Sequence, residues 1–293
     1  MSSKTIAILS PGDMGHGVGR ALAAAGHRVT TCLEGRSERT RQLAAAASIQ
    51  DRPSLGLMLQ ETDLVLSILP PAAAPETAKA VAAAMTETGA TPPFIDCNAV
   101  SPETVRKMGD ALAGAGAPFI DGGIIGLAPG RGPATRFYVS GPDCGPADWL
   151  TCDGIEVKPV GAEIGRASAM KMCYAALTKG TFTLHAAVLV AAEAMGLSDE
   201  LRAEFEFSQA ETLARMQAMV PRLPADSARW IGEMEEIAKT FAAAGVTPDF
   251  HNGAAAVFSL LAETPLAAET RETIDTTRGL EETIRVFARH LPM

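Results

Sequence analysis

The chain lacks the cysteine spacing of a metal site or of a disulfide-stapled fold. Its five cysteines are an odd number, and no two of them form a C-x-x-C pair. They are Cys32, Cys97, Cys144, Cys152 and Cys173. We therefore expect no disulfide framework and no bound metal, and free thiols are typical of a reducing compartment.

The chain also lacks a run of basic residues. Lys and Arg total 25 against 34 Asp and Glu, which gives a formal net charge of −9. Proteins that bind nucleic acid broadly need clustered Lys and Arg to contact phosphates. We therefore expect no nucleic-acid partner.

No uninterrupted hydrophobic run is long enough to span a bilayer. The best candidate, Ala186–Ala192, lies between His185 and Glu193 and falls far short of about 20 apolar residues. The N-terminal stretch is interrupted early by Pro11 and Gly12, which is not typical of a signal peptide. These features predict a cytoplasmic protein with no membrane partner.

Apolar residues are plentiful. They make up 47% of the 293 residues, and charged residues make up 20%. This balance is typical of a folded protein, and the length is sufficient for two domains.

Short apolar runs alternate with helix-period segments in the first half of the chain. The runs typical of strands are Thr5–Leu9, Arg28–Leu33, Asp63–Leu69, Pro93–Cys97, Pro118–Ile124, Arg136–Ser140 and Ile155–Val160. The helical segments between them are Gly15–Ala25, Glu38–Ala46, Pro75–Met85 and Pro102–Ala113. This alternation predicts βαβ units and a buried parallel sheet.

The second half of the chain has only helical patterns. They cover Gly161–Met195, Asp199–Met219, Pro224–Ala244, Thr247–Ala262 and Arg278–His290. The change near residue 160 predicts an α/β Rossmann-type domain over 1–160, with a mostly parallel, doubly wound sheet. A long helix over 161–195 would join this domain to an all-α domain. The long helix and the all-α domain together would cover residues 161–293.

The segment SPGDMG follows the first expected strand and is close to the dinucleotide-binding pattern G-x-G-x-x-G. In that loop the glycines allow a tight turn, close approach of the pyrophosphate and close helix–strand packing. The second and third glycines are kept, a small serine replaces the first, and the following helix offers N–H groups to phosphate. We expect the whole segment to bind a dinucleotide: Ser10, Pro11, Gly12, Asp13, Met14 and Gly15. The alternative is an ordinary strand–helix turn.

The residues after the second expected strand bear on the choice between NAD and NADP. Glu34 could accept a hydrogen bond from the ribose 2′-hydroxyl of NAD. Arg36, Ser37 and Arg39 instead suit the 2′-phosphate of NADP. We favour NADP, with NAD as the alternative cofactor.

Four segments, taken in order, resemble the β-hydroxyacid dehydrogenases of the 6-phosphogluconate dehydrogenase-like superfamily. They are Ile6–Val29, Asp63–Pro71, Asp96–Thr104 and Gly161–Gly180. The closest resemblance is to the branch with a DUF1932 C-terminal domain. It implies a Rossmann domain joined by a long helix to a helical domain, in agreement with the segmentation above, and a homodimer.

The resemblance also implies roles for individual residues. Lys171 matches the catalytic lysine, and Leu69 and Pro70 match the segment that passes the nicotinamide. Asn98 could reach the nicotinamide ribose or carboxamide, or could simply terminate its strand. His251 could project from the helical domain into the cleft, or could cap a helix.

A lysine at this position suits alcohol oxidation. A base must take the hydroxyl proton as hydride leaves for the nicotinamide, and the reverse reaction needs an acid. A lysine amine titrates near pH ~10.4, so burial or a nearby cation must favour its neutral form. Apolar neighbours predict that the Lys171 helix is buried nearly all round. Tyr174 and Thr178 share the face of Lys171, and Lys179 falls at its edge.

Two departures from the family pattern concern the substrate. The family has Asn three or four residues after the lysine, whereas this chain has Tyr174 and Ala175. We expect the Tyr174 phenol to take over. The family's Ser-Gly-Gly substrate loop is replaced by Ile125, Gly126 and Leu127. Loss of that hydroxyl favours a bulkier or less polar substrate than a small hydroxyacid.

Three functions are consistent with this pattern. The favoured one is an NAD(P)-dependent dehydrogenase that transfers hydride between the nicotinamide and the carbinol carbon of a hydroxyacid-like or other small alcohol. An imine reductase of the same shape is an alternative, although imine reductases typically lack the lysine. A non-catalytic dinucleotide-binding module is the third.

Overall fold

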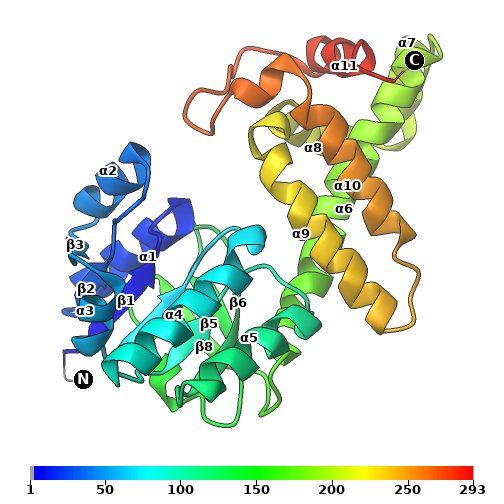
Figure 1. Cartoon of the computed structure of the whole chain (residues 1–293). Helices are drawn as coiled ribbons and strands as arrows, with labels where there is room; N and C mark the ends of the chain where they lie inside the picture. Colours follow the sequence, from blue (N-terminus) through cyan, green and yellow to red (C-terminus); the bar gives the residue numbers. More distant parts are fainter. Residues whose placement is uncertain (1–2, 293) are drawn as a thin grey trace. The chain divides into compact units, whose positions relative to one another are not determined.

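The computed structural model describes residues 3–292. By its internal contacts the chain divides into two compact units, one ending at Met172 and the other beginning at Cys173 (Figure 1). The division falls within a long helix, α6 (Arg166–Ala194). Each unit is described by itself below.

The first unit contains one eight-stranded sheet. Its strands are β1 (Thr5–Leu9), β2 (Arg28–Thr31), β3 (Gln50–Asp51), β4 (Leu64–Ser67), β5 (Phe94–Asp96), β6 (Phe119–Ile125), β7 (Thr135–Ser140) and β8 (Ile155–Pro159). Their order is β3-β2-β1-β4-β5-β6-β7-β8, and every neighbouring pair is parallel except β6 and β7. The predicted mostly parallel, doubly wound sheet is confirmed.

Helices cover both faces of this sheet. They are α1 (Asp13–Ala24), α2 (Glu38–Ala46), α3 (Leu55–Gln60), α4 (Ala74–Thr88) and α5 (Pro102–Gly114). Val18 and Leu22 of α1 lie in one apolar layer, whereas Val81 of α4 and Leu112 of α5 lie in the other. Both faces of the central strands β1, β4 and β5 are therefore buried, which explains why their sequences do not alternate between apolar and polar residues.

Two elements of this unit were absent from the sequence-based prediction. The strand β3 has two residues and both are exposed, and α3 has six. Neither is long enough to show a periodic apolar pattern. Ser54 marks the start of α3, because its hydroxyl accepts a hydrogen bond from Leu57 N at 3.2 Å.

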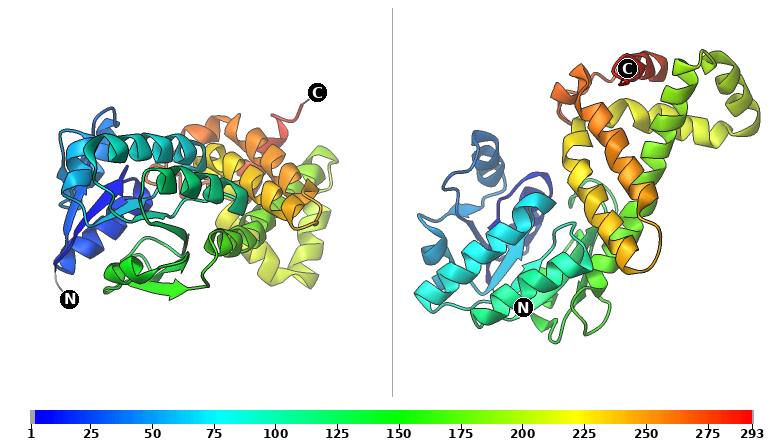
Figure 2. Two further views of the ribbon diagram at one scale, coloured as in Figure 1. Left: turned by 60° about the horizontal axis from the view of Figure 1, so that its bottom comes forward. Right: turned by 45° about the vertical axis from the view of Figure 1, so that its right-hand side comes forward.

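The second unit is helical. After the remainder of α6 come α7 (Ser198–Ser208), α8 (Ala210–Met219), α9 (Pro224–Ala243), α10 (Asp249–Ala262) and α11 (Leu280–Ala288). The helices α9 and α10 lie side by side (Figure 2). Trp230 of α9 contacts Phe258 of α10 and Phe182 of α6, with ring centroids 5.3 Å and 6.4 Å apart. The predicted helix over 199–219 is two helices, because the backbone leaves the helical region at Gln209.

The helix α6 is less buried than its apolar sequence predicts. Leu177 is 73% exposed and Leu184 is 62% exposed, so the expectation of a helix buried nearly all round is wrong for the single chain. By length and composition, α6 is also the one helix among residues 3–292 that could cross a membrane. The core helix of a soluble protein passes the same test.

Candidate functional site

The candidate site begins where the winding of the sheet reverses. The strands β1 and β4 are parallel neighbours, yet the helices that follow them, α1 and α4, pack on opposite faces. In open α/β sheets, ligands bind at the carboxyl ends of the strands at such a switch point. The segment Ser10–Gly15 follows β1 at this point.

Ser10 adopts a backbone conformation that glycine prefers. Its φ is +55°, in the left-handed region, and Gly12 N donates a hydrogen bond to Ser10 O at 2.7 Å. A side chain in that region is strained by contact between Cβ and the backbone. The loop therefore retains the tight turn that the first glycine of the pattern allows, at some cost in strain.

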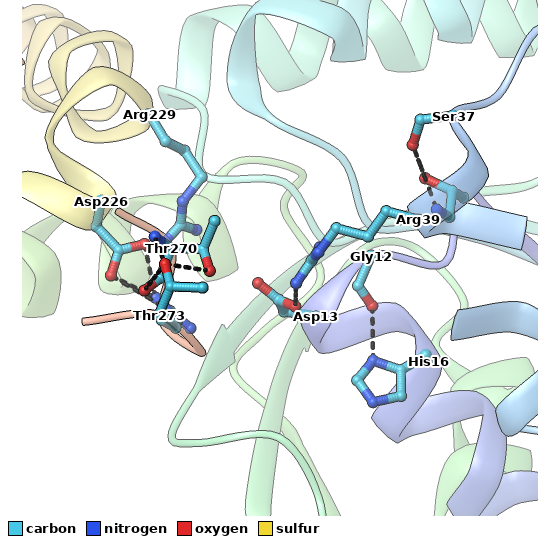
Figure 3. A network of polar contacts seen from close by, with 11 residues as sticks. Gly12, Asp13, His16, Ser37, Arg39, Asp226, Arg229, Thr270 and Thr273 are labelled. Carbon is cyan, nitrogen blue, oxygen red and sulfur yellow. Dashed lines mark hydrogen bonds and ion pairs between the residues drawn. The ribbon is translucent and has the colours of Figure 1, made fainter. Parts of the chain in front are cut away.

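The start of α1 has no side-chain cap. Its N-cap is Gly12, whereas Ser37 and Ser101 cap α2 and α5 with their hydroxyls. The His16 ring lies against the Gly12 carbonyl, with Nδ1 3.0 Å from the oxygen (Figure 3). Backbone N–H groups left without a side-chain cap at a glycine turn fit a pyrophosphate.

A charged bridge joins α1 to α2. Arg39 donates to Asp13 Oδ1 at 2.6 Å, so a guanidinium of α2 lies at the first residue of α1 (Figure 3). Of the other predicted residues, Glu34 is exposed, Arg36 is half-buried, and the exposed Ser37 caps α2 by accepting from Thr40 N at 3.2 Å. Of the cationic groups expected for a 2′-phosphate, Arg39 thus contacts the segment Ser10–Gly15, and the hydroxyl of Ser37 already has a structural partner.

Asn98 is enclosed rather than open to a ligand. Its Oδ1 accepts from Leu69 N at 2.5 Å, and its Nδ2 donates to Ser67 Oγ at 2.9 Å and to Asp96 Oδ1 at 2.5 Å. Only 1% of the residue is exposed. Asn98 therefore holds the backbone of Leu69 in place through its side chain, and its contact with the nicotinamide stays a prediction.

Asp96 beside it is fully buried. The pKa of this carboxyl is raised to about 7, chiefly by burial and also by the neighbouring Asp121 carboxylate, against the hydrogen bonds from Asn98 and Ser67 that lower it. The two aspartates are paired across β5 and β6.

Lys171 of α6 points at the end of β6. Its Nζ donates to the carbonyl oxygen of Ile124 at 2.5 Å, and the residue is half-buried. The close approach depends on Gly123, since a Cβ there would lie 2.9 Å from Lys171 Cβ and from Ala167 O. An amine held at the carboxyl end of the sheet, within the unit that contains the dinucleotide-type loop, can exchange a proton with a ligand there.

A buried carboxylate sits three residues before Ile124. Asp121 accepts hydrogen bonds at Oδ2 from Ser140 Oγ, Gly165 N and Ser168 N, at 2.9, 2.8 and 3.1 Å. At Oδ1 it accepts from Ser168 Oγ at 2.5 Å. Sequence reasoning missed this residue, although glycines inside a strand signal a close backbone approach and the strand reads Asp-Gly-Gly.

Two family models match the chain. Residues 5–99 match "NADP oxidoreductase coenzyme F420-dependent", which covers the strand–loop–helix segment of the site. Residues 192–261 match "Domain of unknown function (DUF1932)" in the helical unit. These two matches, with the folds of solved structures, support the β-hydroxyacid dehydrogenase-like superfamily predicted from the sequence. The predicted DUF1932 domain in the C-terminal half is matched directly.

Solved structures share the fold of this chain over nearly its whole length. A conserved hypothetical protein from Sinorhizobium meliloti 1021 aligns with a TM-score of 0.67 at 22% identity, covering 99% of this chain and 97% of that one. The 3-hydroxyisobutyrate dehydrogenase of Mycobacterium tuberculosis, solved with L-serine, aligns at 0.65 and 21%, covering 97% and 99%. An imine reductase from Streptomyces aurantiacus aligns at 0.53 and 19%, covering 96% and 99%.

One curated relative is similar in sequence. The "Uncharacterized 28.5 kDa protein in 7S RNA 5′region" of Methanothermus fervidus is 27% identical over 173 residues, or 59% of this chain. The match spans 65% of that relative, less than two thirds of its length.

The end of β6 is where the sequence departs from the family pattern that it resembles. Ile125 is only 2% exposed, so its side chain is buried at the position where the family has serine. Gly126 follows with φ +122°, and Leu127 is 59% exposed. The loop therefore presents backbone and an apolar side chain in place of a hydroxyl.

The remaining predicted residues belong to the second unit. Tyr174 is 47% exposed, and Thr178 Oγ1 donates back to Tyr174 O at 3.2 Å and to Ala175 O at 3.3 Å. Lys179 Nζ forms an ion pair with Glu233 Oε2 at 2.6 Å, and both side chains are largely buried. Sequence reasoning missed this partner because Glu233 is far along the chain, on α9.

His251 lies inside the second unit, on α10. It is 7% exposed, its ring contacts Phe241 at 4.3 Å between centroids, and burial lowers its pKa. The N-cap of α10 is Pro248, so the expected capping role for His251 is wrong. A second polar cluster of this unit pairs Asp226 with Arg229 at 2.8 Å (Figure 3). Asp226 also pairs with Arg271 at 2.8 Å.

Proposed function

We propose that this protein is an NADP(H)-dependent oxidoreductase in which Lys171 carries the proton. The observation that supports this most directly is the Lys171 amine held 2.5 Å from Ile124 O, at the carboxyl end of the sheet.

The residues around the switch point fit a dinucleotide. Gly12 leaves the start of α1 without a side-chain cap, and a Cβ at Gly12 would meet no atom within 4 Å, so there is room above the loop. Arg36 and Arg39 supply positive charge for a 2′-phosphate. Glu34 is exposed and could serve NAD, which remains the alternative cofactor.

The cofactor, when bound, supplies or accepts the hydride. In the reductive direction Lys171 donates a proton to the substrate oxygen as the carbonyl carbon gains hydride. In the oxidative direction it takes the proton from the hydroxyl as the carbinol carbon loses hydride. Hydride from the cofactor and a proton from Lys171 account for the whole reduction. We propose that Tyr174 assists by donating a hydrogen bond from its phenol to the substrate.

We infer that the substrate is bulkier or less polar than a small hydroxyacid. The end of β6 offers the buried Ile125, the backbone of Gly126 and the exposed Leu127, none of which has a side-chain donor for a carboxylate. Thr178, Lys179 and His251 stay as weaker candidates for substrate contacts. Lys179 and His251 are largely buried, and Lys179 is paired with Glu233.

We also propose a homodimer. Leu177 and Leu184 of α6 are large apolar side chains that the single chain leaves exposed. A second copy would bury them, as symmetric homo-oligomers commonly do. Sedimentation at micromolar concentration should give twice the mass of the chain.

The test starts with fluorescence titration of the protein with NADPH and with NADH. Turnover is then assayed with NADPH against ketones and keto acids, and against cyclic imines in parallel. Activity on carbonyl compounds that needs Lys171 supports the proposal. Activity on imines that survives the loss of Lys171 favours an imine reductase, whose fold the chain shares. Tight NADPH binding without turnover on either panel favours a non-catalytic module.

A further inference from the structure

The strand β6 and the helix α6 contact each other twice in the same register. Asp121 bonds Ser168, and three residues later on both elements Ile124 bonds Lys171. Between the two contacts, Gly123 lets the backbone of β6 approach α6. The amine of Lys171 is therefore set by a strand and a helix that are held in a fixed alignment.

The start of helix α6 is capped by a residue of another element, the strand β6. The helices α2, α3 and α5 each begin at a serine whose own hydroxyl accepts from the first turn. At α6 the acceptor is instead the carboxylate of Asp121, on β6, which takes the N–H groups of Gly165 and Ser168. A local cap ends a helix but does not orient it, whereas a cap from a strand ties the helix to that strand.

Burying the carboxylate of Asp121 carries a free-energy cost that its hydrogen bonds must offset. Asp121 is fully buried, and a buried carboxylate is tolerated only when hydrogen bonds replace its water. Here Ser140 adds a further bond to Asp121 and also accepts from Ala167 N at 3.0 Å, so β7 joins the same anchor. Four donors converge on one side chain, and three of them are groups of Gly165 and Ser168 at the start of α6.

We propose that Asp121 is a positioning residue that, through Ser168, holds the Lys171 amine at Ile124. A lysine has a flexible stem of four carbons, so the place of its amine depends on where its own backbone is held. Ser168 lies one turn before Lys171 and fixes the rotation of α6 at that turn. The inference rests on the proposed function, in which Lys171 carries the proton.

Two variants test the hydrogen bond between Ser168 and Asp121 separately from the charge of Asp121. Ser168→Ala removes the hydroxyl bond to Asp121 Oδ1 and retains the backbone bond from Ser168 N. Asp121→Asn removes the charge, yet an amide can keep its oxygen toward the three donors and donate its N–H to the Ser168 hydroxyl. Ser227→Ala is the matched control, because Ser227 is also fully buried, donates its hydroxyl to Pro224 O at 2.7 Å, and lies on α9.

The readout needs no substrate. The full chain is acetylated with limiting acetic anhydride, and the labelling rate of Lys171 is measured by peptide mass spectrometry relative to the exposed Lys79 and Lys107. We expect Ser168→Ala to change the relative rate at Lys171 by about threefold or more, because the amine is no longer held at one place. Asp121→Asn and Ser227→Ala should stay within about twofold of the wild type.

A purely structural anchor would give a different result. If Ser168→Ala lowers the melting temperature as Ser227→Ala does and leaves the Lys171 rate unchanged, the positioning role is wrong. The failure of the proposed function is visible separately, as turnover that survives Lys171→Ala. Ser168→Ala should also lower kcat while leaving the dissociation constant of NADPH unchanged.

Discussion

Arg39 of α2 forms an ion pair with Asp13, the first residue of α1, at 2.6 Å. The pair spans from the segment after β2 to the segment after β1, the two regions proposed to hold the adenosine half of the cofactor. Both side chains are partly exposed, at 49% and 35%, so the pair itself contributes little to stability. Arg39 is therefore available to an anionic ligand that competes with Asp13.

We expect Arg39→Ala to weaken NADPH binding more than NADH binding. Loss of a charged hydrogen bond to a partly exposed phosphate should raise the dissociation constant of NADPH about 5–20-fold, or roughly 1–2 kcal/mol. The dissociation constant of NADH should change less than about twofold. Fluorescence titration measures both, with Lys107→Ala on α5 as the control. Equal weakening of the two cofactors would contradict a role in recognising the 2′-phosphate.

Ser10→Gly should stabilise the protein. The left-handed conformation of Ser10 costs about 1–2 kcal/mol for a side chain, and the greater freedom of glycine in the unfolded chain returns about 0.4–1 kcal/mol. The net gain in the free energy of unfolding should be about 0.5–1 kcal/mol, measured by urea unfolding.

Ser48→Gly is the matched control for this variant. Ser48 has φ +57°, nearly the same as Ser10, and lies outside the cofactor loop. Both variants should gain stability, and neither should lose NADPH binding. Loss of stability in Ser10→Gly but not in Ser48→Gly would show that the Ser10 side chain makes a stabilising contact that outweighs its strain.

The free energy of unfolding should depend on the protonation of Asp96. The pKa of Asp96 is about 7 in the folded protein and near its ordinary value of 3.8 in the unfolded chain. At pH values between these two, the folded protein keeps a proton on Asp96 that the unfolded chain has released. The stability that this protonation contributes is therefore present at low pH and lost as the pH rises through about 7.

Asp96→Asn tests this directly. From pH 5 to pH 8 the wild type should lose roughly 2–3 kcal/mol of stability relative to the variant, since about two pH units of that range lie below the folded pKa. Urea unfolding at both pH values gives the difference. A constant difference between wild type and variant would show that Asp96 stays ionised when buried.

The sequence was informative where structure is local. The helix over Glu38–Ala46 has the predicted bounds. Ser37 caps its start with a side-chain hydrogen bond, and Ala47 is its C-cap. The strands followed from apolar runs, since a parallel sheet buried on both faces needs them. The glycines of the segment Ser10–Gly15 predicted a tight turn after β1, although they did not predict the left-handed conformation of Ser10.

The sequence was less informative where partners are distant. The bonds of Asn98 to Ser67 and Leu69 and the ion pair of Lys179 with Glu233 join segments that no local pattern connects. The exposure of Leu177 was missed for a related reason. An apolar sequence predicts burial but does not say whether the same chain or another one provides it.

The central claim is that Lys171 moves the proton. The most direct measurement is single-turnover oxidation of NADPH by Lys171→Ala, with Lys107→Ala as the control and a carbonyl substrate selected from the panel. We expect the rate to fall about 10²–10⁴-fold, the usual contribution of a general acid, with the NADPH dissociation constant within about twofold of the wild type. A Lys171→Ala variant that turns over at a rate close to the wild type would contradict the account.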